Sequence, residues 1–228
     1  MALVAVAAPG FVHASDLDGV PLFFARGVPP RPQAFSIERQ FHSVLLETVR
    51  VVRSRTPRAF GALERITSAG ALVSKPGFHG LGRAFDHDIW EFEHVVISPL
   101  RGDHASLRKA RRQRYWALAA LMRSQSAFVL HGEFNAAHQD HLHQDNGGGR
   151  AFSTSSEATV KLVQAVCAHV YGHALEIDGD FGTASRAAVA LSMGEAGVAG
   201  DIFDPGQFKR FLLRSGRLGF HRSIEARA

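Results

Sequence analysis

Five side chains that can bind a metal ion or carry a proton lie within eight residues near the middle of the chain. They occur in the string NAAHQDHLHQD and are His138, Asp140, His141, His143 and Asp145. Ordinary core packing gives no reason for such a density of imidazole and carboxylate groups. Because imidazole nitrogens and carboxylate oxygens are typical zinc ligands, we interpret this string as part of a metal site.

A second cluster lies upstream, in the string FHGLGRAFDHD. His79 and Asp86 stand seven positions apart there, with Gly80 and Gly82 between them. A tight turn at the glycines could bring His79 back towards Asp86. Two nitrogen ligands, one carboxylate and an open fourth position would describe a catalytic zinc site, in which a bound water acquires a pKa near about 7.

Strand geometry could aim these side chains at one point. Side chains alternate between the two faces of a strand, so His141 and His143 would project to the same side. Asp86 and Asp88 have the same relation, and His87 would face away. A histidine beside the metal, with an ordinary pKa of about 6.5, could take and return a proton during hydrolysis. The alternative is a chance spacing of surface histidines, in a chain that contains 13 of them.

Helical and strand patterns surround both clusters. Apolar residues at helical spacing predict helices over residues 36–53 and 105–125. The first 35 residues, rich in proline and glycine, predict an extended and irregular segment. Short strands are predicted over residues 63–73, 83–89, 128–131 and 140–145.

The string NGGGRAFSTSSEA, residues 146–158, is rich in glycine, serine and threonine and predicts a linker. We therefore divide the chain into a domain with the metal site, residues 1–150, and a small second domain, residues 158–228. Three short helices are expected in the second domain, over about residues 159–171, 184–193 and 205–213.

The composition suits a soluble globular protein, with 228 residues of which 46% are hydrophobic and 21% charged. The one cysteine, Cys167, excludes an internal disulfide and fits a buried small side chain. The N-terminal string MALVAVAAPG lacks the basic leader of a signal peptide, and no segment is long enough to span a bilayer. We therefore expect no membrane span.

A dense basic run holds Arg108, Lys109, Arg111, Arg112 and Arg114, in a chain of net charge +5. A basic surface could serve nucleic acid or an anionic cell-wall polymer, or the run could be a solvated helix face. Nucleic-acid binding would weaken steeply with salt and would come without affinity for cell walls. We favour the solvated helix face and expect no nucleic-acid partner.

Two strings resemble motifs of known families. HGLGRAFD, residues 79–86, resembles the H-x-x-G-x-A-x-D motif of the zinc D-alanyl-D-alanine carboxypeptidases. FVLHGEFNAAHQDHLHQD, residues 128–145, resembles the second motif of the extensin-like C-terminal domain, in the same wider group of peptidoglycan metallopeptidases. The resemblance covers roughly residues 60–146. It implies an α+β fold in which a small antiparallel sheet with flanking helices carries the zinc site.

The resemblance also implies roles for individual residues. His79, Asp86 and His143 would bind Zn²⁺. His141 would act as general base or stabilise the tetrahedral intermediate, and His138 would line the catalytic site. Asp140 and Asp145 would either orient the ligands from behind or face solvent in turns, and Arg83 would either bind substrate or serve the fold.

The chain departs from these families in several places. It lacks the cysteines usual in extensin-like domains, and Gly77 replaces a common serine two residues before His79. The substrate-anchoring arginine that often lies upstream has no clear match in TSAGALVSK. The nearest upstream glutamate, Glu133, stands ten residues before His143, whereas carboxypeptidases of the group usually have their base closer. These departures favour His141 as the base and weaken the case for a strict carboxypeptidase.

The C-terminal strings TVKLVQAV and IDGDFGTASRAAV resemble the peptidoglycan-binding domain of three helices, with its D-G-x-F-G turn at residues 178–182. The two resemblances together imply a monomeric zinc peptidase that cuts amide bonds in peptidoglycan stem or cross-bridge peptides, as endopeptidase or D,D-carboxypeptidase. Such an enzyme would act on the cell wall, in the periplasm or outside the cell, although the chain shows no export signal. The alternative is a non-catalytic protein that binds peptidoglycan or forms part of a phage or injection apparatus.

Overall fold

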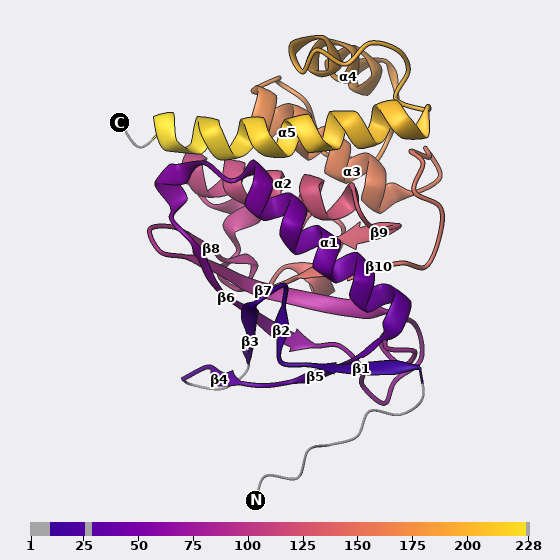
Figure 1. The fold of residues 1–228 in the computed structure, drawn as a ribbon. Helices are drawn as coiled ribbons and strands as arrows, with labels where there is room; N and C mark the ends of the chain where they lie inside the picture. The colour runs from indigo at the N-terminus through magenta and orange to yellow at the C-terminus, as the bar shows by residue number, and fades with distance from the viewer. Residues whose placement is uncertain (1–9, 26–28, 227–228) are drawn as a thin grey trace, which may run out of the picture.

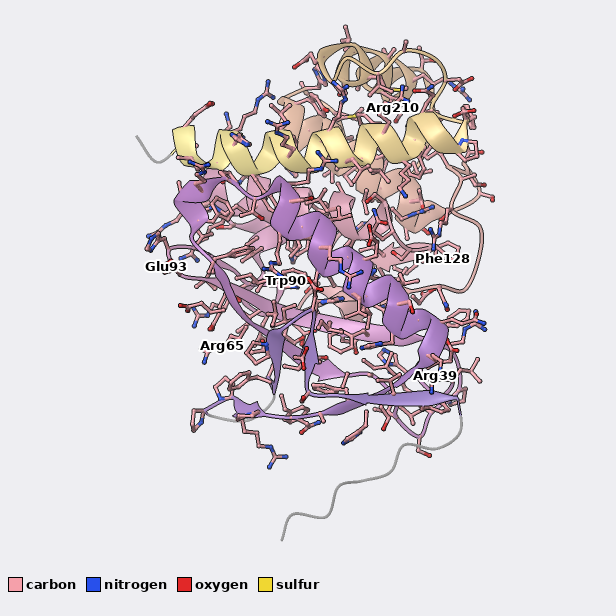
Figure 2. All side chains as sticks on the ribbon, in the orientation of Figure 1. Arg39, Arg65, Trp90, Glu93, Phe128 and Arg210 are labelled. Atoms are coloured by element: carbon pink, nitrogen blue, oxygen red, sulfur yellow. The ribbon has the colours of Figure 1, made fainter. Side chains whose placement is uncertain are left out.

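A computed structural model describes residues 10–25 and 29–226 of the chain (Figure 1). Within these residues it has five α-helices and ten strands, and the predicted α+β class is confirmed. Helices α1, α2 and α5 lie on one side of the main sheet in Figure 1, with α5 outermost. The central strand β7 contributes Trp90, which is fully buried in the interior (Figure 2).

The main sheet is mixed and has the strand order β2-β3-β6-β7-β10-β9, with β4 beside β3 and β8 beside β7. Strands β3 and β6 are parallel, and the other neighbours are antiparallel. Strands β1 and β5 form a separate antiparallel pair. The bounds are β1 Phe11–Ala14, β2 Asp16–Leu17, β3 Val20–Phe24, β4 Arg31–Pro32, β5 Phe35–Glu38, β6 Leu63–Gly70, β7 Ala84–Phe92, β8 Val96–Ile97, β9 Phe128–Leu130 and β10 Leu142–Asp145.

The sheet is larger than the small antiparallel sheet that we expected, because the N-terminal segment contributes strands. For the residues that the structure describes, the segment is extended as predicted, but it is regular, and the prediction of irregular structure was wrong. Asp18 and Gly19 both have positive φ, 55° and 79°, and form a tight turn between β2 and β3. An Asp-Gly pair between apolar residues is a hairpin signal, and it outweighs the surrounding prolines. Residues 1–9 lie outside the described part of the chain.

Helix α1, Arg39–Arg55, begins at a carboxylate cap: Glu38 accepts hydrogen bonds from the backbone N–H groups of Gln40 and Phe41. Its buried residues recur at helical spacing and pack into the core. Helix α2, Lys109–Arg123, is buried along most of its length. Both helices confirm the elements predicted over residues 36–53 and 105–125.

The C-terminal segment contains α3, Glu157–Val166, which continues as a π-helix to Tyr171, then α4, Thr183–Glu195, and α5, Pro205–Glu225. Helix α5 is longer than predicted and packs along α2. A Cβ at Gly216 would lie 2.4 Å from Leu121 Cγ, so glycine allows this close approach. The apolar core is continuous between residues before 146 and residues after 158. The division into two domains stays a prediction.

No helix in the described residues is both long enough and apolar enough to cross a membrane. Cys167 is buried, as expected.

Candidate metal centre

A doubled-back loop between β6 and β7 carries His79. The backbone carbonyl of His79 accepts hydrogen bonds from the N–H groups of Val73 at 3.3 Å and Gly82 at 3.0 Å. A Cβ at Gly80 would lie 2.1 Å from the carbonyl oxygen of Lys75, so only glycine fits where the two arms of the loop meet. The glycine turn therefore returns His79 to the start of β7, where Asp86 lies.

Asp86 on β7 stands directly opposite His143 on β10 in the antiparallel pairing. Both side chains project to the same face, and the imidazole of His79 meets them there. His79 Nε2 lies 3.1 Å from Asp86 Oδ1 and 3.1 Å from His143 Nδ1, and His143 Nδ1 lies 3.0 Å from Asp86 Oδ1. The structure thus brings the three sequence-predicted metal ligands together.

This triangle of ligand atoms could hold a metal ion. A metal that is bound tetrahedrally at about 2.0–2.1 Å keeps its ligand atoms about 3.3 Å apart, close to the observed separations. Three protein ligands occupy one face of such a tetrahedron and leave the fourth position open. The three side chains are buried, with 4% to 9% of each residue exposed. The opening to solvent is therefore narrow but present.

Hydrogen bonds behind the ligands fix which ring nitrogen faces the centre. His79 Nδ1 lies 2.6 Å from the carbonyl oxygen of Ala71 and must donate to it, which leaves the Nε2 lone pair towards Asp86. His143 Nε2 lies 3.2 Å from Asp145 Oδ2, and a proton there leaves Nδ1 towards the centre. Partners of this kind orient metal-binding histidines in many sites.

The electrostatics of the centre favour a positive charge. Burial opposes ionisation of Asp86, yet hydrogen bonds with His143 and His79 hold its pKa well below the usual range. Burial also opposes protonation of His143, but hydrogen bonds to Asp145 and Asp86 raise its pKa to about 9. The ionised carboxylate attracts a cation, and a metal ion bound at His143 Nδ1 would displace the proton that this raised pKa describes.

Two further histidines border the triangle. His141 Nε2 lies 3.6 Å from Asp86 Oδ1, and its Nδ1 lies 2.8 Å from Asp140 Oδ1. The ring centre of His138 lies 5.1 Å from that of His141 and 5.7 Å from that of His143. His138, His141 and His143 form a second group that could hold a metal ion. Neither group of potential ligands in the described residues includes Glu133.

His138 is held in its neutral form. Burial, followed by the charges of His141 and His143, lowers its pKa to about 4. Its Nδ1 lies 2.7 Å from Asn135 Oδ1 and donates to it, so Nε2 carries a lone pair. His138 could therefore accept a hydrogen bond from a ligand at the site.

The opposite face of the sheet carries a buried polar chain. His87, next to Asp86, turns away from the centre as predicted, and its Nε2 lies 3.0 Å from Gln144 Oε1. Gln144 donates in turn to Thr48 Oγ1 of α1 at 2.9 Å, and Trp90 donates to His87 Nδ1 at 3.3 Å. This chain connects β7, β10 and α1 directly behind the metal ligands.

Arg83 lies beside the site without joining the ligand groups. Its Nε donates to Asn146 Oδ1 at 2.9 Å, and its guanidinium lies over the Phe78 ring at 5.4 Å. It thereby connects the His79 loop to the residues after β10. Its substrate-binding role stays a prediction.

Sequence reasoning missed two supporting groups, the Ala71 carbonyl and the Asn135 side chain. A backbone acceptor leaves no signal in a residue pattern. Asn135 could have been noticed, because it caps the short helix that ends at His138.

Comparisons with known proteins add no relative: no family model, curated protein or solved structure matches this chain.

Proposed function

We propose that this protein is a zinc-dependent peptidase that hydrolyses amide bonds in the stem or cross-bridge peptides of peptidoglycan. One observation carries the proposal: the ligand atoms of His79, Asp86 and His143 lie within 3.1 Å of one another, next to a third imidazole, that of His141. A hydrolytic metal site needs at least three protein ligands and a nearby group that can carry a proton.

The donor set favours a transition metal such as zinc over Mg²⁺ and Ca²⁺. Mg²⁺ and Ca²⁺ prefer sites made almost entirely of oxygen, whereas two imidazoles and one carboxylate suit Zn²⁺. When bound there, Zn²⁺ would supply a water whose pKa is lowered to about 7 and would polarise the scissile carbonyl.

The chain's own residues then move the proton. Asp140 Oδ1 accepts the Nδ1–H of His141 at 2.8 Å, which leaves His141 Nε2 without a proton and directed at the centre. His141 Nε2 takes the proton from the attacking water and returns it to the leaving amine. His138 Nε2 accepts a hydrogen bond from the substrate, because its Nδ1–H is already given to Asn135.

Two features support a peptide of the cell wall as substrate. The first is the resemblance of residues 79–86, 128–145, 159–166 and 177–189 to motifs of peptidoglycan-acting families. The second is the His79 loop, which exposes three apolar side chains, Leu72, Val73 and Leu81, at 41%, 39% and 52%. Such side chains suit a substrate rich in alanine methyl groups. The site of action is then the wall itself, in the periplasm or outside the cell.

The decisive experiment is mass spectrometry of muropeptides after incubation of sacculi with the protein, with and without a chelator. New and shorter peptides that disappear with the chelator support the proposal. We expect His143→Ala to lose both zinc and hydrolysis, and His141→Ala to keep zinc but lose most of the rate. Retention on sacculi with unchanged muropeptides would instead favour a binding protein without catalysis.

A further inference from the structure

A basic groove runs along one side of the helical layer, apart from the metal centre. It consists of three adjoining hollows of about 640, 410 and 560 Å³. Tyr171 lines both the first and the second hollow, and Lys109 and Ala226 line both the second and the third. The shared residues place the three hollows side by side. None of the metal ligands lines it.

The end of the groove at the start of α2 is lined by the basic run that the sequence contains. Arg108, Lys109, Arg111 and Arg114 surround the third hollow together with Arg101, and no acidic residue lines it. The sequence alone favoured a solvated helix face for this run. The structure instead places four of its five members around one concavity.

The other end of the groove follows α5. Arg210, Arg214 and Arg217 recur on one face of that helix, and Arg55 at the end of α1 faces them across the first hollow. Figure 2 labels Arg210 on α5 at the top of the view. Glu195 is the one acidic residue that lines this hollow.

Positive charge is concentrated in this groove. Ten arginines and lysines line the three hollows against two glutamates, a surplus of eight positive charges. The whole chain has a net charge of +5, so all its remaining residues together carry a net charge of −3. A basic protein with a featureless surface would not segregate its charge in this way.

Most of these cations are not neutralised by the protein. Arg222 pairs with Glu195 at 3.4 Å and Arg111 with Asp103 at 3.9 Å, and Arg114 is buried and donates to Ser223. Arg108, Lys109 and Arg217 make no ion pair within the described chain. Basic residues in the first turn also oppose the dipole of α2, which has no acidic residue there. A bound anion would neutralise the unpaired cations and would also interact favourably with the dipole of α2.

The length of the groove indicates a polymer. Residues 210 to 226 rise about 24 Å along the axis of α5, far more than one phosphate or carboxylate needs. Two of the aromatic rings in the lining are already stacked within the protein, Tyr171 on Phe211 and His169 on Trp116.

We propose that the basic groove binds a linear phosphodiester polymer without bases, of the polyol-phosphate type found in cell walls. The existence of a polyanion site follows from the charge and shape of the groove alone. The choice of a wall polymer rests on the proposed function. Such a polymer would hold the enzyme at its substrate and raise the local substrate concentration for the metal centre.

The test is the binding of purified, lipid-free poly(glycerol phosphate) to the full chain, measured by calorimetry over a range of salt concentrations. Affinity should fall steeply with salt, because several phosphates release their counterions on binding. The triple variants R210Q/R214Q/R217Q and R108Q/K109Q/R111Q should each lose about tenfold or more in affinity. The charge-matched control R39Q/R150Q/R186Q removes three exposed arginines outside the groove and should keep at least half of the affinity.

Four outcomes would overturn the proposal: no binding, a salt-independent affinity, an equal loss in the control variant, or tighter binding of duplex DNA or of oligo(dT) with the same number of phosphates. Circular dichroism and unchanged zinc content establish that each variant folds. His143→Ala should bind the polymer as the parent does, even if it has lost hydrolysis. Polymer binding therefore tests the groove, and hydrolysis separately tests the proposed peptidase.

Discussion

His87 on β7 and Gln144 on β10 are joined by a hydrogen bond of 3.0 Å on the face of the sheet opposite the metal centre. Their sequence neighbours, Asp86 and His143, stand opposite each other on the other face. Because the side chains of a strand alternate, a slip of one residue would turn the metal ligands to the wrong face. The buried bond therefore fixes the register on which the metal centre depends.

We expect Gln144→Leu to destabilise the fold and weaken metal binding. The change leaves the buried His87 Nε2–H without its acceptor, which costs about 1–3 kcal/mol, and removes the bond that Thr48 Oγ1 accepts, although Thr48 still donates to the Val44 carbonyl. Denaturant unfolding gives the loss of stability, and a competition titration with a chromogenic chelator gives the zinc affinity. Gln40→Leu, on the exposed side of α1, is the matched control and should change stability by less than about 0.5 kcal/mol. An unchanged unfolding midpoint for Gln144→Leu would contradict this role.

Asp145→Asn should weaken zinc binding while leaving the reaction rate at saturating zinc nearly unchanged. The carboxylate at 3.2 Å from His143 Nε2 orients the ring and makes it more basic. Loss of such a partner typically lowers metal affinity by about 10–100-fold. The same competition titration measures the affinity, and muropeptide release at excess zinc measures the rate. A variant with full affinity would show that Asp145 only stabilises the turn, through its bond to the Gly147 N–H at 2.8 Å.

Asp140→Asn should have the opposite effect, because Asp140 supports His141 rather than a ligand. The amide no longer fixes the proton on His141 Nδ1, so Nε2 is less available as a base. We expect bound zinc to be unchanged and the hydrolytic rate to fall by about tenfold or more. Zinc content by elemental analysis and initial rates on a muropeptide test both parts. Loss of zinc with the rate would instead make His141 a metal ligand, as the second histidine group allows.

Local rules in the sequence predicted part of the site, whereas the choice of His143 as the third ligand, 57 residues from Asp86, rested on the resemblance to known families. A glycine turn returns His79 to Asp86, and alternation along strands places His87 on the far face. The partners at long range were not predictable in this way. Gln144 and His87 are 57 residues apart in the sequence, and they form a hydrogen bond only when the register of β7 and β10 is set. The length of α5 was also missed, since Gly216 resembles a helix breaker but allows α2 to approach closely.

Gly80→Ala tests the loop that presents His79. The added Cβ would lie 2.1 Å from the Lys75 carbonyl oxygen, a backbone atom that cannot move aside cheaply. We expect a loss of about 1–3 kcal/mol in stability and a clear loss of zinc affinity, because His79 is displaced. Gly149→Ala is the control: its Cβ would meet nothing within 4 Å, and its φ lies outside the left-handed region. Equal behaviour of the two variants in thermal unfolding and zinc titration would disprove the steric argument.

The stability of the fold should fall as the pH falls from about 6.5 to 4, in part through His131. This residue is fully buried, its Nε2 donates to the Ala158 carbonyl at 2.9 Å, and burial lowers its pKa to about 4. The unfolded chain takes up a proton at His131 in this range and the folded chain does not, so acid favours unfolding. The shift corresponds to about 3 kcal/mol that is present above pH 6.5 and lost by about pH 4. Urea unfolding at a series of pH values should show a shallower acid slope for His131→Gln than for the parent. The exposed His221→Gln should keep the parent slope; a parent-like slope in His131→Gln would assign the acid sensitivity to other groups.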